Sequence, residues 1–403
     1  MNALPQLDLG MVERTEYAPY QRLRSPVPQR KKGTLSFVDL FSGIGGFHLG
    51  LEHAAHRARY EIKLLFASEI DEPARRAYFE NYGTVPLGDV ATIPTAAASS
   101  ADFLFGGFPC QPFSNSGLKR GLDDERGGLF LEIKRMILGA RTRKSPGHIG
   151  PKAFLLENVA GLVTNGSDKP GLSRLHAGPI RKIGSTMVRL EHELLSMKDY
   201  DVAWKEIVSS DFGSPQVRRR VFILGIHRDF GVSASSLFPG GSTHRNSIRS
   251  IIEGRVVPGT DLNENQRRNI LKDIKNNDMP SFRDGIRRVG RAYHCDGGNV
   301  GQCYHVDGLA PTLTVVWSHF LPLYFPGAKE RRPNLDARDF KPGAAYGSGH
   351  LRRATTREAL RLQGFPDDFR ILGKAQEIYA QAGNAVNVNV VKELLSPVVS
   401  VIG

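Results

Sequence analysis

The chain contains little cysteine, with only Cys110, Cys295 and Cys303 among its 403 residues. Three cysteines are too few for a disulfide framework, and they lack the spacing of a zinc site. His294 and His305 lie close to two of them, so a metal cluster is an alternative to two ordinary cysteines in a glycine-rich loop. We favour ordinary cysteines and expect no metal site.

Long apolar runs are also missing from the sequence. None approaches the roughly 20 residues that cross a bilayer, and the N-terminus lacks the apolar core of a signal peptide. The composition is that of a globular protein, with 40% hydrophobic and 24% charged residues. We therefore expect a cytoplasmic protein with no membrane partner, long enough for more than one domain.

Acidic residues are in deficit. The chain has 54 Lys and Arg against 41 Asp and Glu, which gives a formal net charge of +13. Such an excess favours a polyanionic partner but carries no sequence specificity. Within residues 1–33, five basic residues and no acid follow Glu16. We expect these residues to form a basic, flexible leader, and two interpretations stay open: an arm on DNA or a disordered segment.

From Thr34 the chain alternates strand-like and helix-like segments. Strands are expected at 35–40, 62–67, 103–105, 153–156, 202–207 and 221–226, and helices at 47–55, 73–82, 356–363 and 388–395. Alternation of this kind predicts an α/β fold with a doubly wound, mostly parallel sheet and helices on both faces.

The alternation fades across residues 228–310, which are rich in Arg, Asn, Gly and Asp. We therefore predict a catalytic and cofactor-binding domain at 34–227 and a second, smaller domain at 228–310. Residues 311–403 are expected to return to the first domain, because a helical pattern resumes there.

A glycine-rich turn follows the first expected strand. Phe41–Gly46 contains three glycines, which let the backbone turn sharply and approach a ligand closely. Glu69 ends the second strand, where an acid can accept hydrogen bonds from ribose hydroxyls, and Asp89 at a third strand end could meet an adenine amine. The glycine spacing is not the dinucleotide pattern, which counts against NAD. A purely structural glycine turn stays open as an alternative.

Cys110 is a candidate nucleophile because it stands alone on a loop after a strand. Pro109 and Pro112 stiffen the backbone around it, which suits a thiol that must be aimed. The polar residues that follow favour an exposed loop over a buried position. Only the thiolate attacks, so positive or polar surroundings should assist it.

Further charged residues border the expected sheet. Glu157 directly follows the strand 153–156, and an acid at the carboxyl end of such a strand points into the ligand crevice. Three consecutive arginines, 218–220, precede the strand 221–226 and could bind a phosphate or a base carbonyl. Each residue taken alone could equally be a salt-bridged surface charge.

In their order, these motifs resemble those of DNA (cytosine-5) methyltransferases of the bacterial restriction–modification type. The matching segments are Asp39–Phe47, Gly107–Ser114, Glu157–Val159, Gln216–Arg220, Pro311–Thr314 and Gly383–Val386. Val217 departs from the pattern, because many members carry Lys there. The resemblance implies a Rossmann-like, S-adenosylmethionine-dependent methyltransferase fold. The gap at 228–310 falls where the family carries its target recognition domain.

The resemblance also implies a reaction. A methyl group would pass from S-adenosylmethionine to carbon 5 of a cytosine flipped out of duplex DNA, through a covalent Cys110 adduct, leaving S-adenosylhomocysteine. Glu157 would hydrogen-bond or protonate ring N3 and Arg220 would hold the carbonyl, with Arg218 in the same catalytic group.

The resemblance assigns binding residues as well. The residues that match the family's cofactor contacts are Phe41, Ile44, Gly46, Glu69, Ile70, Asp89, Val90, Pro109, Asn384 and Val386. Phe41 would lie against the adenine. Ser114, Lys119 and Arg126 belong to a segment like the family's loop that closes over DNA.

We expect a monomer that binds double-stranded DNA at the nucleoid, beside a cognate endonuclease that acts separately. Two other functions stay open: a tRNA methyltransferase on the same core, whose Cys-Phe-Thr signature is missing here, and a non-catalytic DNA-binding relative. Intact Cys110, Glu157 and Arg220 argue against the second. A nicotinamide dehydrogenase is the weakest alternative, given the glycine spacing.

Overall fold

The structure is a computed structural model whose chain divides into two units, Met1–Arg30 and Lys31–Gly403. It describes residues 32–108, 128–139, 150–166, 170–242, 245–253, 259–276, 281–292, 301–314, 321–326, 350–370 and 372–403. All of these lie in the second unit. The expected leader, 1–33, therefore lies outside the described residues except for its last two positions.

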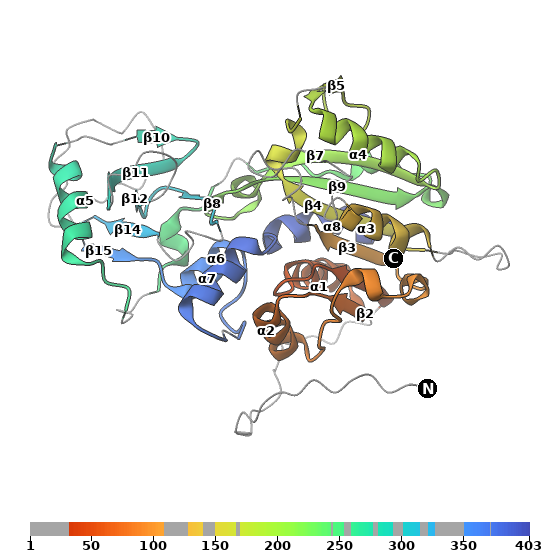
Figure 1. The fold of residues 1–403 in the computed structure, drawn as a ribbon, viewed down its shortest axis with the longest axis horizontal. Helices are drawn as coiled ribbons and strands as arrows, with labels where there is room; N and C mark the ends of the chain where they lie inside the picture. Colours follow the sequence, from red (N-terminus) through yellow and green to blue (C-terminus); the bar gives the residue numbers. More distant parts are fainter. Residues whose placement is uncertain are drawn as a thin grey trace. The chain divides into compact units, whose positions relative to one another are not determined.

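A six-stranded sheet forms the main part of the fold (Figure 1). Its strands are β1 (Gly33–Leu40), β2 (Tyr60–Ser68), β3 (Phe103–Gly107), β4 (Ala153–Val159), β7 (Tyr200–Val208) and β9 (Arg219–His227). They lie in the order β2-β1-β3-β4-β9-β7. The first four are parallel, whereas β9 runs antiparallel to both β4 and β7.

The sheet is therefore mixed, and the sequence did not show that β9, between β4 and the edge strand β7, runs antiparallel to both. The reason is the link between β7 and β9, residues 209–218, which is too short for the crossover that parallel neighbours need. All six strands lie where the alternating pattern predicted strands. The pattern located each strand and predicted a mostly parallel sheet, but it did not predict the reversed direction of β9.

Helices cover both faces of this sheet, as predicted. They are α1 (Gly46–Ala58), α3 (Gly128–Leu138), α4 (Ser185–Leu195) and α8 (Val388–Ile402), whereas α2 (Glu72–Tyr82) packs through Ala74 and Ala77 in a separate apolar core. Alternate residues of β4 point to opposite faces: Phe154 and Leu156 pack in the core that contains α3 and α4, and Leu155 in the core that contains α1 and α8. The last helix of the chain thus packs beside the first.

A second sheet follows in the chain. It contains β10 (Ser281–Arg283), β11 (Ile286–Arg291), β12 (Gln302–His305), β14 (Pro322–Phe325) and β15 (His350–Arg353), in that order. Helix α5 (Glu264–Asn276) packs on it through Ile270 and Ile274. Two of the five strands follow residue 310, so this sheet extends beyond the boundary expected there. Two smaller pairs are β5 (Gly171–Leu172) with β6 (Lys182–Ile183), and β8 (Gln216–Val217) with β13 (Ala310–Pro311).

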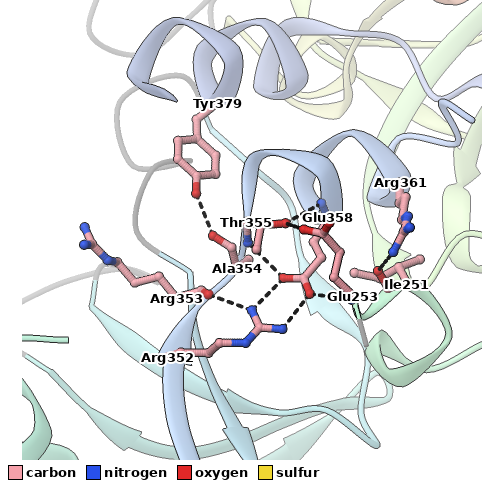
Figure 2. A network of polar contacts seen from close by, with 9 residues as sticks. All are labelled: Ile251, Glu253, Arg352, Arg353, Ala354, Thr355, Glu358, Arg361 and Tyr379. Atoms are coloured by element: carbon pink, nitrogen blue, oxygen red, sulfur yellow. Dashed lines mark hydrogen bonds and ion pairs between the residues drawn. The ribbon is translucent and has the colours of Figure 1, made fainter. Parts of the chain in front are cut away.

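A buried ion pair joins the end of the second sheet to the next helix, α6 (Thr356–Leu362), as Figure 2 shows. The guanidinium of Arg352 in β15 donates to both carboxylate oxygens of Glu358, at 2.8 and 2.6 Å. Glu358 also accepts the backbone N–H groups of Thr355 and Glu253. Because its carboxylate is fully buried, each of these donors offsets part of the cost of removing a charge from water.

Helix α7 (Ala375–Asn384) follows α6, and the hydroxyl of Tyr379 in α7 donates to the carbonyl of Ala354 at 2.6 Å. By length and composition, Ala375–Ile402 could cross a membrane, but 61% of its most apolar window is buried inside the protein. Burial of this kind is typical of core helices and gives no support to a membrane span.

Candidate active site

A cavity of 610 Å³ opens at the carboxyl ends of β1 and β2. Seven of the ten residues predicted to contact a cofactor line it: Phe41, Ile44, Glu69, Ile70, Asp89, Val90 and Asn384. They come from segments far apart in the sequence, with Asn384 at the end of α7. The structure therefore brings together residues that the sequence pattern could only name separately.

The glycine turn between β1 and α1 forms one wall of this cavity. Phe41 and Gly43 have positive φ angles of 54° and 52°, so the backbone reverses sharply there. Gly46 does not line the cavity. A Cβ atom at Gly46 would lie 2.7 Å from both the Cγ1 and the carbonyl oxygen of Val386, so these two predicted residues pack on each other. That close approach places the 385–387 segment against the start of α1.

Glu69 holds the turn in place. Its Oε2 accepts the N–H of Gly43 at 2.9 Å, and its Oε1 accepts the N–H groups of Ile70 and Asp71, each at 2.8 Å. Because each carboxylate oxygen has more than one lone pair, the same group can still accept a hydrogen bond from a ligand hydroxyl. Glu69 is thus both part of the cavity wall and the brace of the turn.

The lining suits a ligand with hydroxyl groups and an aromatic ring. Two carboxylates, Glu69 and Asp89, supply acceptors, and Ile44, Ile70 and Val90 supply apolar surface. Ile70 is 76% exposed, which is unusual for an isoleucine and leaves its side chain free to contact a bound molecule. These residue types fit the adenosine part of S-adenosylmethionine.

Asp39 lies in β1 just before the turn and is fully buried. Burial raises the pKa of its carboxyl well above the ordinary value, and the nearby charge of Glu69 raises it further. The sequence analysis did not select this residue, although its place in the matching segment Asp39–Phe47 was a signal.

The second group of predicted residues lies on β4 and β9. The Nε of Arg220 lies 2.9 Å from Oε1 of Glu157, and both side chains are largely buried. In the antiparallel register Val159 faces Arg220, so the carboxyl end of β4 meets the start of β9. The pair is next to the cavity, because Gly107 lines the cavity and a Cβ atom there would lie 3.9 Å from Oε2 of Glu157.

Asn158 holds the chain next to the predicted nucleophile. Its Nδ2 donates to the carbonyl of Phe108 at 3.1 Å, and Phe108 is the last described residue before Pro109 and Cys110. The predicted site residues Pro109, Cys110, Ser114, Lys119 and Arg126 lie outside the described residues. The end of β3 thus fixes where the segment with the candidate nucleophile begins, beside Glu157.

Arg218 has a different environment from Arg220. It is 3% exposed, and its guanidinium donates to the carbonyls of Leu313 and Ala385, at 3.2 and 3.0 Å. Burial, together with the neighbouring charge of Arg220, lowers its pKa to about 9. These contacts favour a bracing role, since they tie two of the family-like segments, 311–314 and 383–386, to the start of β9.

Two of the residues considered as metal ligands, Cys303 and His305, lie in β12 (Gln302–His305) and are both buried. Burial raises the pKa of the Cys303 thiol and lowers the pKa of His305 to about 3. Their surroundings are those of core side chains. His294 and Cys295 lie outside the described residues.

Sequence reasoning missed three cavity residues on α7. Glu377, Ala380 and Gln381 line the cavity together with Asn384. Their spacing of three, four and seven residues from Glu377 is that of a single helix face, so a signal was present in the sequence.

A family model described as C-5 cytosine-specific DNA methylase matches residues 35–400. The Type II methyltransferase M1.ScrFI of Lactococcus lactis subsp. cremoris is 31% identical over 98% of this chain and 85% of its own length. The Type II methyltransferase M.HpaII of Haemophilus parainfluenzae is 30% identical over 95% of this chain and 94% of its own length.

Among solved structures, the S. pombe Dnmt2 methyltransferase is similar with a TM-score of 0.59 and 20% identity, over 90% of this chain and 97% of its own. A putative DNA modification methyltransferase encoded in an E. coli prophage gives a TM-score of 0.55 at 20% identity, over 91% of this chain and 99% of its own. These likenesses show a Rossmann-like methyltransferase fold with a mixed sheet. The chain belongs to the C-5 cytosine-specific DNA methylase family and is a DNA (cytosine-5) methyltransferase.

Proposed function

We propose that the chain is the modification enzyme of a Type II restriction–modification system, methylating carbon 5 of a cytosine flipped out of duplex DNA. The observation that carries the proposal is the Glu157–Arg220 pair, which lies next to the 610 Å³ cavity and to the start of the Cys110 segment. An acid and a guanidinium are two of the groups that activation of a cytosine ring requires, and Cys110, two residues beyond Phe108 in the sequence, would supply the thiol.

In this proposal, the thiolate of Cys110 adds to carbon 6, which breaks the aromaticity of the ring and makes carbon 5 nucleophilic. Glu157 hydrogen-bonds or protonates N3, and Arg220 holds the ring carbonyl, so both favour the charge that develops on the ring. Carbon 5 gains the methyl group and then loses its proton, and the electrons of that C–H bond expel Cys110. The 2.9 Å contact between Glu157 and Arg220 keeps the acid oriented before the base arrives.

The residues that line the cavity would hold S-adenosylmethionine. Glu69 would accept hydrogen bonds from the ribose hydroxyls, Asp89 would meet the adenine amine, and Phe41 and Ile70 would contact the ring. When bound, the cofactor supplies an electrophilic methyl group on a sulfonium, and S-adenosylhomocysteine is left. Because Gly107 borders both the cavity and Glu157, the methyl donor and the target ring would meet at that glycine.

Recognition of the DNA sequence is proposed for the second sheet and α5, in a target recognition domain that starts near residue 228. Since β14 and β15 complete this sheet, we place the end of the domain after Arg353 rather than at 310. Ser114, Lys119 and Arg126 are proposed to close over the DNA. We further propose a monomer in the bacterial cytoplasm, associated with the nucleoid, and a separate cognate endonuclease.

The central test uses duplex DNA with 5-fluorocytosine at the target position. Fluorine at carbon 5 cannot leave as a proton does, so the enzyme should stay bonded to the DNA through Cys110 as a denaturation-resistant complex that requires the cofactor. The Cys110→Ala variant is the matched control and should give no such complex. Tritiated methyl transfer to duplex DNA and to tRNA, measured side by side, separates the proposal from a tRNA methyltransferase. No transfer to either would favour a non-catalytic DNA-binding protein.

A further inference from the structure

A basic hairpin lies at the open edge of the main sheet, outside the site described above. It consists of residues 170–184, with β5 and β6 as its two short strands beside α4 and β7 (Figure 1). The segment contains Arg174, Arg181 and Lys182 and no Asp or Glu. Its charge is therefore wholly positive, apart from the titratable His176.

The hairpin displays apolar side chains to solvent. Ile180 is 82% exposed and Leu172 is 60% exposed. Leu172 faces Lys182 across the two strands, whereas the neighbouring Ile183 is buried in the core. Because successive side chains on a strand point to opposite sides, the Leu172–Lys182 pair faces away from the protein.

A buried carboxylate anchors the hairpin rigidly. Glu191 of α4 is 3% exposed and accepts hydrogen bonds from the Trp204 indole at 2.7 Å, the Arg174 N–H at 2.9 Å and the Ser173 hydroxyl. The backbone of Trp204 also bonds to Leu175 and Ala177, so this segment covers the open edge of β7. The hairpin is thus preformed, and a partner that binds it does not need to order it.

A row of charges runs from the hairpin to Arg219 at the start of β9, on the opposite face of that strand from Arg220. Arg181 lies 2.8 Å from Glu206, and Glu206 lies 3.8 Å from Arg219. Arg219 directly precedes Arg220, which pairs with Glu157. By contrast, Arg174 and Lys182 are exposed and have no ion-pair partner within the part of the chain that the structure describes.

We propose that this hairpin is a second DNA-contacting surface, which holds the duplex beside the target base. The inference rests on the proposed action on duplex DNA. Duplex DNA carries one negative charge per about 1.7 Å of helix axis, and the exposed cations Arg174 and Lys182, which have no ion-pair partner among the described residues, complement it. Exposed aliphatic side chains such as Ile180 and Leu172 suit contact with sugars in the minor groove, as in other proteins that place apolar side chains there.

The first test removes the two unpaired cations together, as Arg174→Ala/Lys182→Ala. Losing two phosphate contacts should make the slope of log affinity against log salt shallower by about 2 and weaken binding at low salt by about tenfold or more. The kcat at saturating DNA should be unchanged, because neither residue touches the reacting groups. The matched control is Arg57→Ala/Lys63→Ala, which removes the same charge near the start of β2, at the opposite end of the strands, and should keep the wild-type slope.

The second test does not depend on how these variants fold. A photoreactive benzoylphenylalanine replaces Ile180 in the otherwise unchanged chain, and irradiation with labelled duplex should give a protein–DNA crosslink. A wild-type salt slope in the double variant would overturn the proposal, and so would crosslinking only to a second copy of the protein. Trapping on 5-fluorocytosine DNA by the wild-type chain is scored in parallel, so a failure of the proposed function is seen separately.

Discussion

Replacing Glu69 by alanine tests whether one carboxylate both holds the Gly43 turn and accepts hydrogen bonds from a cofactor in the cavity. The side chain accepts three backbone N–H groups, from Gly43, Ile70 and Asp71, and it lines the cavity. A hydrogen bond to a charged group contributes about 1.5–3 kcal/mol, so the loss of one ligand contact predicts about ten- to hundredfold weaker binding of S-adenosylmethionine. Loosening of the Gly43 turn should add to this loss.

Calorimetry with the cofactor alone measures the effect, and DNA binding measured separately should change much less. Glu72→Ala is the matched control, because Glu72 lies only three residues along and pairs with Arg75 on the surface of α2 without lining the cavity. Glu69→Gln keeps a single acceptor oxygen and should fall between wild type and Glu69→Ala. An unchanged dissociation constant in Glu69→Ala would refute the assignment, whereas equal losses in Glu69→Ala and Glu72→Ala would point to a general charge effect.

Three further predictions follow from buried groups near the site. Because folding raises the pKa of Asp39, the contribution of this carboxyl to stability is present at low pH and is lost as the pH rises. In denaturant titrations from pH 5 to 8, the free energy of unfolding of Asp39→Asn should therefore rise relative to that of the wild type. Parallel pH profiles of the two proteins would contradict this. Arg218→Lys cannot reach both the Leu313 and Ala385 carbonyls, and should lower the free energy of unfolding by about 2–4 kcal/mol and weaken cofactor binding, whereas Arg219→Lys should do neither. Gly46→Ala places a Cβ atom 2.7 Å from Val386 and should lower the free energy of unfolding by about 1–3 kcal/mol, as measured by thermal unfolding. Gly88→Ala should leave it almost unchanged, because a Cβ atom added there meets nothing within 4 Å.

The alternating apolar segments were enough to locate the main sheet and most of its helices. Local patterns could not reveal the reversed direction of β9, because that direction depends on the short 209–218 link and on pairing with β7. The second sheet was missed for a related reason. Its strands are three to six residues long and come from segments as distant as Ser281 and Arg353, so its pairing is set by tertiary packing.

Within the site, position at strand ends indicated Glu69 and Glu157, and the family resemblance singled out Arg220; the structure places Glu69 at the cavity and the other two beside it. The sequence did not reveal that Glu69 also braces the Gly43 turn, because a hydrogen bond across 26 residues leaves no local signature. Nor did the sequence show that Arg218 and Arg220 lie in different surroundings. Arginines two positions apart look alike in a sequence, and only their partners distinguish Arg218, which donates to two backbone carbonyls, from Arg220, which pairs with Glu157.

The Arg352–Glu358 ion pair has a consequence for the inheritance of specificity between relatives. It joins the last strand of the second sheet to α6, and Glu358 also accepts the backbone N–H of Glu253, which precedes α5 and that sheet in the chain (Figure 2). One carboxylate thus ties the chain before α5 to the chain after the last strand of this sheet. A gene fragment exchanged by recombination would keep this fastening if it ran from before Glu253 to beyond Glu358, or if both parents carried the same pair. A breakpoint at 310 would instead divide the second sheet between β12 and β14.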